Sequence, residues 1–131
     1  MRTMEMHPEQ IEFKVKIRTP VYPTENPDRI IDCLNKIFPE AIWEINEKKI
    51  TGESTSLKTF AEIIQNMRIR DTVRSYIKDR IIGDRCSFTL SKQASCNRKV
   101  NLSDEDQPLG GIHVTIESED IDKLINKITE T

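Results

Sequence analysis

The feature that most constrains the fold is the strict alternation of apolar and charged side chains in IEFKVKIR, residues 11–18. Successive side chains of a strand point to opposite faces of its sheet, so this pattern predicts a strand with one buried face and one wet face. A strand of a parallel sheet that is covered on both faces would be apolar throughout. We therefore expect a sheet whose helices pack on one face only.

Four segments carry the apolar stripe of an amphipathic helix. The first covers residues 27–38, and the last follows a capping sequence at residues 118–120. Between them, residues 56–82 contain neither Gly nor Pro, but the apolar stripe changes to the opposite face near residues 66–68. One straight helix would have to bury two opposite sides, so we predict two helices with a break there and a final end at Gly83.

Short apolar runs predict the other strands. They lie near residues 41–45, 48–53, 86–91, 99–102 and 112–117. Strands and helices do not alternate strictly along the chain, an order typical of α+β folds. We predict a single α+β domain over residues 1–131, with a mostly antiparallel sheet of about six strands and about four helices packed on one face. Residues 1–10 are expected to be a flexible leading tail.

Length, charge and cysteine content limit the class of protein. The chain has 131 residues and a formal net charge of -2, which argues against an indiscriminate polyanion binder. No apolar run approaches the roughly 18 residues that cross a bilayer, and the N-terminus lacks a signal-peptide core, so we expect no membrane association and no export. The odd set of Cys33, Cys86 and Cys96, without a CxxC pair, predicts reduced thiols and a cytoplasmic location.

The small net charge hides a strong segregation along the chain. Residues 66–100 carry nine basic and three acidic side chains, a balance of +6. Residues 101–131 carry two basic and eight acidic side chains, a balance of -6. Such asymmetry indicates either a charged partner or a surface on which the two segments neutralise each other.

No constellation of residues in the sequence indicates catalysis, a metal or a cofactor. Zinc-ligand spacings and phosphate-binding glycine patterns are missing. His113 is expected to point outward from its strand, but no sequence feature brings it to Cys96, as an activated thiol would require. Cys33 and Cys86 lie among apolar residues and are predicted to be small core groups. We therefore predict that the protein is not an enzyme and has no metal and no cofactor.

The basic segment is the most informative part of the sequence. Three cations follow one another at i, i+4 and i+8 along the predicted helix that begins near Ile69, and like charges at this spacing cost roughly 0.2–0.5 kcal/mol per pair. The stretch FTLSKQASCNRKVNL, residues 88–102, begins and ends like a strand and predicts a hairpin with a polar tip. Arg70, Arg74 and Lys78 form this basic ridge. Either the ridge is an exposed helix face that happens to be basic, or the ridge and the hairpin form one site. The candidate RNA-binding residues of that site are Arg70, Arg74, Lys78, Arg85, Lys92, Gln93, Arg98, Lys99 and Asn101.

Several stretches of the same region resemble a known family. They are Gln65, IRDTVR at 69–74, FTLSKQAS at 88–95, KVNL at 99–102 and PLG at 108–110. Together they resemble archaeal uncharacterised protein family 0201, with Ser91 where that family usually has Asn. The resemblance implies an α+β fold similar to the large-subunit ribosomal protein that holds the five-S RNA. It also implies an RNA-binding protein, with a link to the exosome as a hypothesis.

We therefore predict a non-catalytic RNA-binding protein that contacts phosphate and sugar of structured RNA. A wider hypothesis is that the protein is a member of an RNA-processing complex. Few aromatic residues are available for base stacking, so we expect a weak sequence preference. The alternative is a protein-interaction subunit or a homodimer, whose basic segment docks an acidic surface such as residues 101–131 of a second copy.

Overall fold

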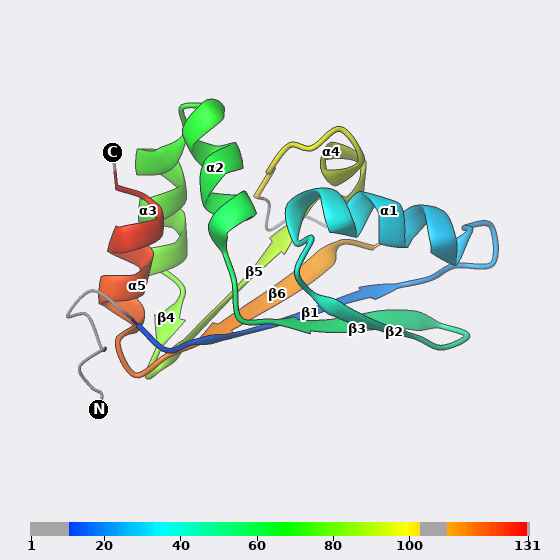
Figure 1. The fold of residues 1–131 in the computed structure, drawn as a ribbon, viewed down its shortest axis with the longest axis horizontal. Helices are drawn as coiled ribbons and strands as arrows, with labels where there is room; N and C mark the ends of the chain where they lie inside the picture. Colours follow the sequence, from blue (N-terminus) through cyan, green and yellow to red (C-terminus); the bar gives the residue numbers. More distant parts are fainter. Residues whose placement is uncertain (1–10, 103–109, 131) are drawn as a thin grey trace.

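The computed structural model describes residues 11–102 and 110–130 (Figure 1). Its strands are β1 (Lys14–Pro20), β2 (Ile42–Ile45), β3 (Lys49–Ser54), β4 (Ile81–Ile82), β5 (Arg85–Leu90) and β6 (Ile112–Glu117). Its helices are α1 (Pro27–Ile37), α2 (Lys58–Asn66), α3 (Arg70–Lys78), α4 (Lys92–Cys96) and α5 (Ile121–Ile128). The tail at residues 1–10, expected to be flexible, lies outside the described residues.

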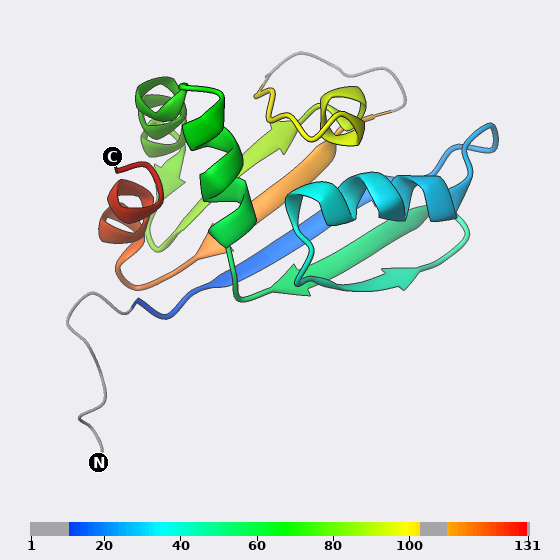
Figure 2. The ribbon, with the colours of Figure 1, turned by 45° about the horizontal axis from the view of Figure 1, so that its top comes forward.

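The six strands form one antiparallel sheet with the order β2-β3-β1-β6-β5-β4. All five helices lie on one face of this sheet (Figures 1 and 2). The predicted fold class, α+β with an antiparallel sheet and helices on one face, is therefore confirmed. No helix in the described part of the chain has both the length and the apolar character needed to cross a membrane.

The apolar core fills the space between the sheet and the helices. Val15 and Ile17 point into it from β1, and the charged residues between them are exposed on the opposite face, as the alternation predicts. The ring of Phe60 lies 6.0 Å from the ring of Phe38 and 5.9 Å from that of Phe88. These aromatic contacts join α2 to the end of α1 and to β5.

The predicted break between two successive helices is confirmed. α2 ends at Asn66, α3 begins at Arg70, and Arg68 between them has a φ of 61°. Phe60 of α2 and Val73 of α3 are both buried, because each helix can turn its own apolar face toward the core once the chain has changed direction.

The predicted end of the second helix at Gly83 is wrong. α3 ends at Lys78, and the chain then forms β4, in which Ile81 pairs with Cys86 of β5. Gly83 has a φ of 62° in the turn between these two strands. A left-handed backbone at a tight hairpin turn favours glycine, so this residue serves a hairpin rather than a helix end.

The predicted return strand at residues 99–102 is also wrong. Only Leu102 bridges to β5, through Leu90, and α4 occupies the expected hairpin tip. The Oγ of Ser91 accepts a hydrogen bond of 3.2 Å from the backbone N–H of Ala94, which caps the new helix. The sixth strand of the sheet is instead β4.

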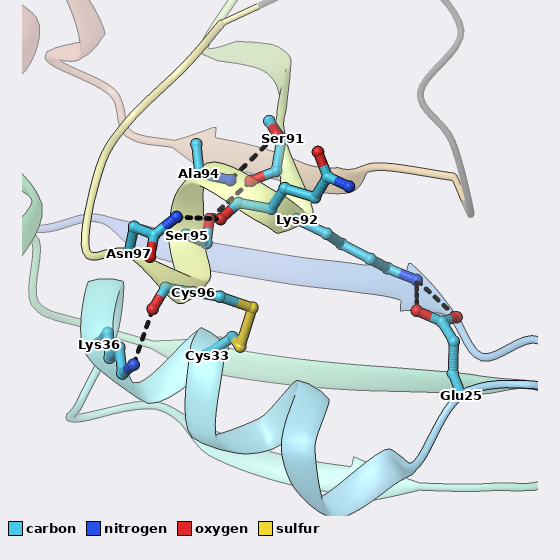
Figure 3. Close-up of a disulfide and its surroundings, with 10 residues drawn as sticks. Glu25, Cys33, Lys36, Ser91, Lys92, Ala94, Ser95, Cys96 and Asn97 are labelled. Atoms are coloured by element: carbon cyan, nitrogen blue, oxygen red, sulfur yellow. Dashed lines mark hydrogen bonds and ion pairs between the residues drawn. A yellow bond between two sulfur atoms is a disulfide. The ribbon is translucent and has the colours of Figure 1, made fainter.

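A disulfide joins Cys33 of α1 to Cys96 at the end of α4 (Figure 3). The expectation of three reduced thiols is therefore wrong for this pair, whereas Cys86 is a free and buried thiol as predicted. α1 packs against α4 and so brings together two cysteines separated by 63 positions in the sequence. The expectation of a cytoplasmic location rested on reduced thiols, so the disulfide removes the support for it.

Candidate nucleic-acid interface

The predicted basic ridge on α3 contacts the end of α5. The guanidinium of Arg74 donates hydrogen bonds to the Oγ1 of Thr129 at 2.9 Å and to its carbonyl oxygen at 2.7 Å. Arg70 donates to the carbonyl oxygen of Glu130 at 3.3 Å. Carbonyl groups at a helix C-terminus lack intrahelical partners, and these arginines supply them. The ridge therefore has a structural role that the sequence did not reveal.

Two further cations of the predicted site lie apart from the hairpin region. The Nζ of Lys78 is 3.9 Å from a carboxylate oxygen of Asp122 on α5. Arg85 begins β5 and is exposed on the open face of the sheet. The rest of that strand separates it from α4 by roughly 17–20 Å, at about 3.3 Å per residue.

Lys92 is a buried residue with 8% of its surface exposed. Its Nζ donates to the two carboxylate oxygens of Glu25 at 3.0 and 3.1 Å and to the carbonyl oxygen of Pro20 at 2.7 Å. Figure 3 shows the side chain running from α4 toward Glu25. Lys92 thus belongs to an internal ion pair, because its register on α4 directs it inward.

The remaining predicted residues gather at one corner of the molecule. Gln93 lies on α4, and Arg98, Lys99 and Asn101 follow directly after that helix. Arg68, which is not among the predicted residues, lies at the turn between α2 and α3. The backbone N–H of Val100 donates to the Sδ of Met67 at 3.4 Å and so holds the two segments together. We call this set the α4 corner surface: Arg68, Gln93, Arg98, Lys99 and Asn101.

All five side chains of the α4 corner surface are exposed. None of them forms an ion pair or a side-chain hydrogen bond with another residue in ranges 11–102 and 110–130. This distinguishes them from the ridge on α3 and from Lys92. Three of the five carry a positive charge, so this corner can attract an anion without first breaking an internal contact.

Two arginines of the α4 corner surface have a left-handed backbone. Arg68 has a φ of 61° just after α2, and Arg98 has a φ of 57° just after α4. Glycine is the usual residue at this position after a helix, and a residue with a side chain costs on the order of 1 kcal/mol there. A cation near a helix C-terminus offsets part of this cost. The sequence signal for Arg68 was available, since the predicted helix break falls on it.

A groove of about 380 Å³ separates the start of α3 from the segment that follows α4. Most of its lining residues are apolar, and four of them have polar side-chain groups: Thr72, Tyr76, Lys99 and Asn101. The lining residues are Met67, Ile69, Thr72, Val73, Tyr76, Ala94, Lys99, Val100, Asn101 and Leu102. The stretches 69–74 and 99–102, which carry the family resemblance, therefore meet in one place. Lys99 and Asn101 line the groove, and Arg68 and Arg98 are direct chain neighbours of lining residues, so the α4 corner surface adjoins this groove.

The α4 segment is held by several independent contacts. The Oγ of Ser95 donates to the carbonyl oxygen of Ser91 at 2.9 Å, and the Nζ of Lys36 donates to the carbonyl oxygen of Cys96 at 2.7 Å. The disulfide between Cys33 and Cys96 ties the same helix to α1 (Figure 3). These contacts place the α4 corner surface on a fixed support. Ser91 fills the N-cap role, for which Asn is equally suited.

The open face of the sheet is a second polar surface, but its charges are mixed. Lys16 lies beside Glu53 on β3, and its Nζ is 4.0 Å from a carboxylate oxygen of Glu117. The Nδ1 of His113 is 3.1 Å from the Oγ1 of Thr89. Burial lowers the pKa of His113, and the charge of Arg18 lowers it further, so this imidazole is mainly neutral at pH 7. The charged side chains of this face are therefore of both signs, whereas those of the α4 corner surface are all positive.

The described residues contain no group of three or more His, Cys, Asp or Glu side chains that could hold a metal ion. Asp104, Glu105 and Asp106 lie outside the described residues. The chemistry of the α4 corner surface is thus that of cations and amides. Such groups bind phosphate and sugar oxygens by charge-assisted hydrogen bonds.

A comparison with protein-family models finds a match over most of the chain. A family described as RNA binding matches residues 14–118, which include every strand and every helix except α5. The match therefore contains both the groove and the α4 corner surface.

Comparisons with individual proteins and with solved structures find relatives that carry the same family name. The UPF0201 protein of Methanothermobacter thermautotrophicus is 36% identical over 116 residues, which cover 86% of this chain and 88% of the relative. The UPF0201 protein of Sulfurisphaera tokodaii is 31% identical over 127 residues, with coverage of 88% and 86%. The crystal structure of the UPF0201 protein from Methanococcus jannaschii gives a TM-score of 0.82 at 28% identity, over 89% of this chain and 99% of that one. A crystal structure of another uncharacterized UPF0201 protein gives a TM-score of 0.77 at 34% identity, over 82% of this chain and 84% of that one.

Proposed function

Because the chain belongs to the UPF0201 family of archaeal proteins, we propose that it is a non-catalytic RNA-binding protein that binds RNA through the α4 corner surface. The family model described as RNA binding supports the choice of ligand. One structural observation supports the choice of surface. Arg68, Arg98 and Lys99 lie together, exposed, and without an ion pair to any other described residue.

The α4 corner surface has the groups that RNA backbone recognition needs. A guanidinium presents a planar set of donors that fits two phosphate oxygens at once, and the Lys99 ammonium adds a point charge. The amides of Gln93 and Asn101 can both donate and accept, which suits the 2′-hydroxyl of a ribose. Contacts to phosphate and sugar carry little sequence information, so the sequence preference of these contacts is weak.

The proposed surface is smaller than the one the sequence predicts. Gln93, Arg98, Lys99 and Asn101 remain in it and Arg68 joins them, whereas the other predicted cations serve internal contacts or the open sheet face. A place in an RNA-processing complex and a homodimer stay predictions of the sequence, since no contact in the described residues favours either one.

A double substitution of Arg98→Ala and Lys99→Ala tests the proposal. Each phosphate contact releases counterions, so losing two contacts is expected to weaken binding at least about tenfold near 0.1 M salt and to lower the salt slope of log Kd by about 1.5. The measurement is a fluorescence-anisotropy titration of a labelled RNA hairpin at several salt concentrations.

The matched control is the double substitution Lys58→Ala and Lys123→Ala. Both lysines are exposed, on α2 and α5, and the change in net charge is the same. Lys58 lies about 15 Å along the helix axis from Arg68, at 1.5 Å per residue. Equal loss of affinity in both double variants would show a diffuse charge effect and reject the α4 corner surface, as would no loss in the first.

A further inference from the structure

The groove beside the α4 corner surface is apolar where it faces the core and polar at its rim. Met67, Ile69 and Leu102 supply apolar side chains, and Val73 forms part of its buried floor. Its volume of about 380 Å³ falls within the range of small-ligand sites. Phosphate and ribose contacts need only exposed cations and amides such as Lys99 and Asn101 at its rim, so the proposed backbone contacts do not use the apolar floor of the groove.

An aromatic ring lines one side of this groove. Tyr76 is half-buried, and the guanidinium of Arg80 lies 3.5 Å from the centroid of its ring. Arg80 also donates a hydrogen bond of 3.0 Å to the carbonyl oxygen of Tyr76. A cation stacked on a ring and bonded to its backbone restricts the movement of that ring. The aromatic side of the groove is therefore preformed.

The rim carries groups that can recognise the edge of a base. Asn101 is exposed and lines the groove, and its amide offers both a donor and an acceptor. Thr72, also exposed, adds a hydroxyl from α3. Lys99 lines the same groove and brings a positive charge to its mouth. An apolar floor, one aromatic side, a polar rim and a positive mouth are complementary to a nucleotide, with its base inside and its phosphate outside.

We propose that this groove holds the base of one unpaired nucleotide of the bound RNA. The inference rests on the proposed function and specifies its ligand: RNA with a bulge, a loop or a single-stranded segment, rather than uninterrupted duplex. In a paired helix the faces of the bases are stacked and their Watson–Crick edges are hydrogen-bonded, whereas an unpaired base can turn outward into a pocket. The phosphates on either side of that nucleotide lie against Arg68, Arg98 and Lys99.

The test compares two RNA hairpins with the same stem, each closed by a flexible non-nucleotide linker so that no loop base is unpaired. One carries a single bulged 2-aminopurine, a fluorescent base whose emission reports its stacking, and the other is fully paired. The wild-type protein is expected to bind the bulged hairpin about tenfold more tightly, since stacking of one base on an aromatic side chain contributes on this scale. The emission of the bulged base is expected to change on binding.

Two substitutions on α3 distinguish base binding in the groove from contacts outside the groove. Thr72→Phe places a large side chain in the groove, and Ser75→Phe places the same side chain on an exposed position of α3 that does not line it. Thr72→Phe is expected to abolish the preference for the bulged hairpin and the emission change, while Ser75→Phe keeps both. Neither substitution is expected to alter affinity for the paired hairpin, because the corner cations are unchanged.

Equal affinity of wild-type protein for both hairpins would overturn the inference, and so would equal behaviour of the two phenylalanine variants. If residues 103–109 of the chain itself occupied the groove, Thr72→Phe would lower Tm and leave the hairpin preference unaffected, which also rejects it. The proposed function is judged separately, by the effect of Arg98→Ala and Lys99→Ala on the paired hairpin. The two claims can therefore fail independently.

Discussion

Replacing Cys33 and Cys96 by serine is expected to lower the free energy of unfolding by about 4 kcal/mol. The disulfide links positions 63 residues apart, and a crosslink across a loop of this length restricts the unfolded chain by about that amount in the chain-entropy description. It also ties α4 to α1, so its loss removes one of the contacts that hold the segment with most of the α4 corner surface.

Urea denaturation followed by far-UV circular dichroism measures this effect. The wild-type protein without reductant is expected to show the highest midpoint, and reductant is expected to lower it to that of the double serine variant. The double serine variant is the control for the reductant, because it has no disulfide and its urea midpoint should not change. A wild-type midpoint that does not respond to reductant would contradict the account.

Thiol alkylation verifies the cysteine states that this prediction assumes. Burial raises the pKa of Cys86 to about 11, and a backbone hydrogen bond with Ile116 offsets only part of the shift. Because the thiolate is the reactive form, the native oxidised protein is expected to resist iodoacetamide at pH 8. Unfolding without reductant should expose one reactive thiol, at Cys86, and unfolding with reductant should expose three.

Replacing Lys92 by alanine is expected to destabilise the protein by about 3–5 kcal/mol, the usual cost of removing one partner of a buried ion pair. The side chains of Lys92 and Glu25 are only 10% and 11% exposed, so the carboxylate would stay buried without its partner. The carbonyl oxygen of Pro20 would also lose its donor. Both losses act in the same direction.

Thermal and urea unfolding of three variants test this expectation. Lys58→Ala removes an exposed lysine and is expected to change stability by less than about 0.5 kcal/mol. The double variant Lys92→Met with Glu25→Gln removes both charges and is expected to recover much of the loss. If Lys92→Ala were as mild as Lys58→Ala, the ion pair would not be the internal contact that the structure shows.

The sequence predicted those parts of the fold that depend on local periodicity. The alternation around Val15 and Ile17 identified a strand with one wet face, and the change of apolar face between Phe60 and Val73 identified two helices. Both signals follow directly from which side of an element must be buried. The pairing of Cys33 with Cys96 left no such signal, because it depends on how two helices pack after the chain has folded.

In the candidate site, too, local patterns predicted some features, whereas others depend on tertiary structure. Lys92 and Lys99 look alike in the sequence, yet the first is buried against Glu25 and the second is exposed. The difference arises from α4, a helix of five residues that capping by Ser91 produces and that hydrophobic patterning did not detect. Likewise, the spacing of the ridge on α3 was correct, but only tertiary structure shows that Arg74 bonds to the end of α5.

The most direct test of the central claim, that RNA binds at the α4 corner surface, is photo-crosslinking with an RNA that carries 4-thiouridine, followed by mass spectrometry of the crosslinked peptides. We expect crosslinks within residues 67–76 and 93–102, which contain the corner side chains and the groove. Crosslinks confined to the open face of the sheet, at residues 14–18 and 85–89, would contradict the account.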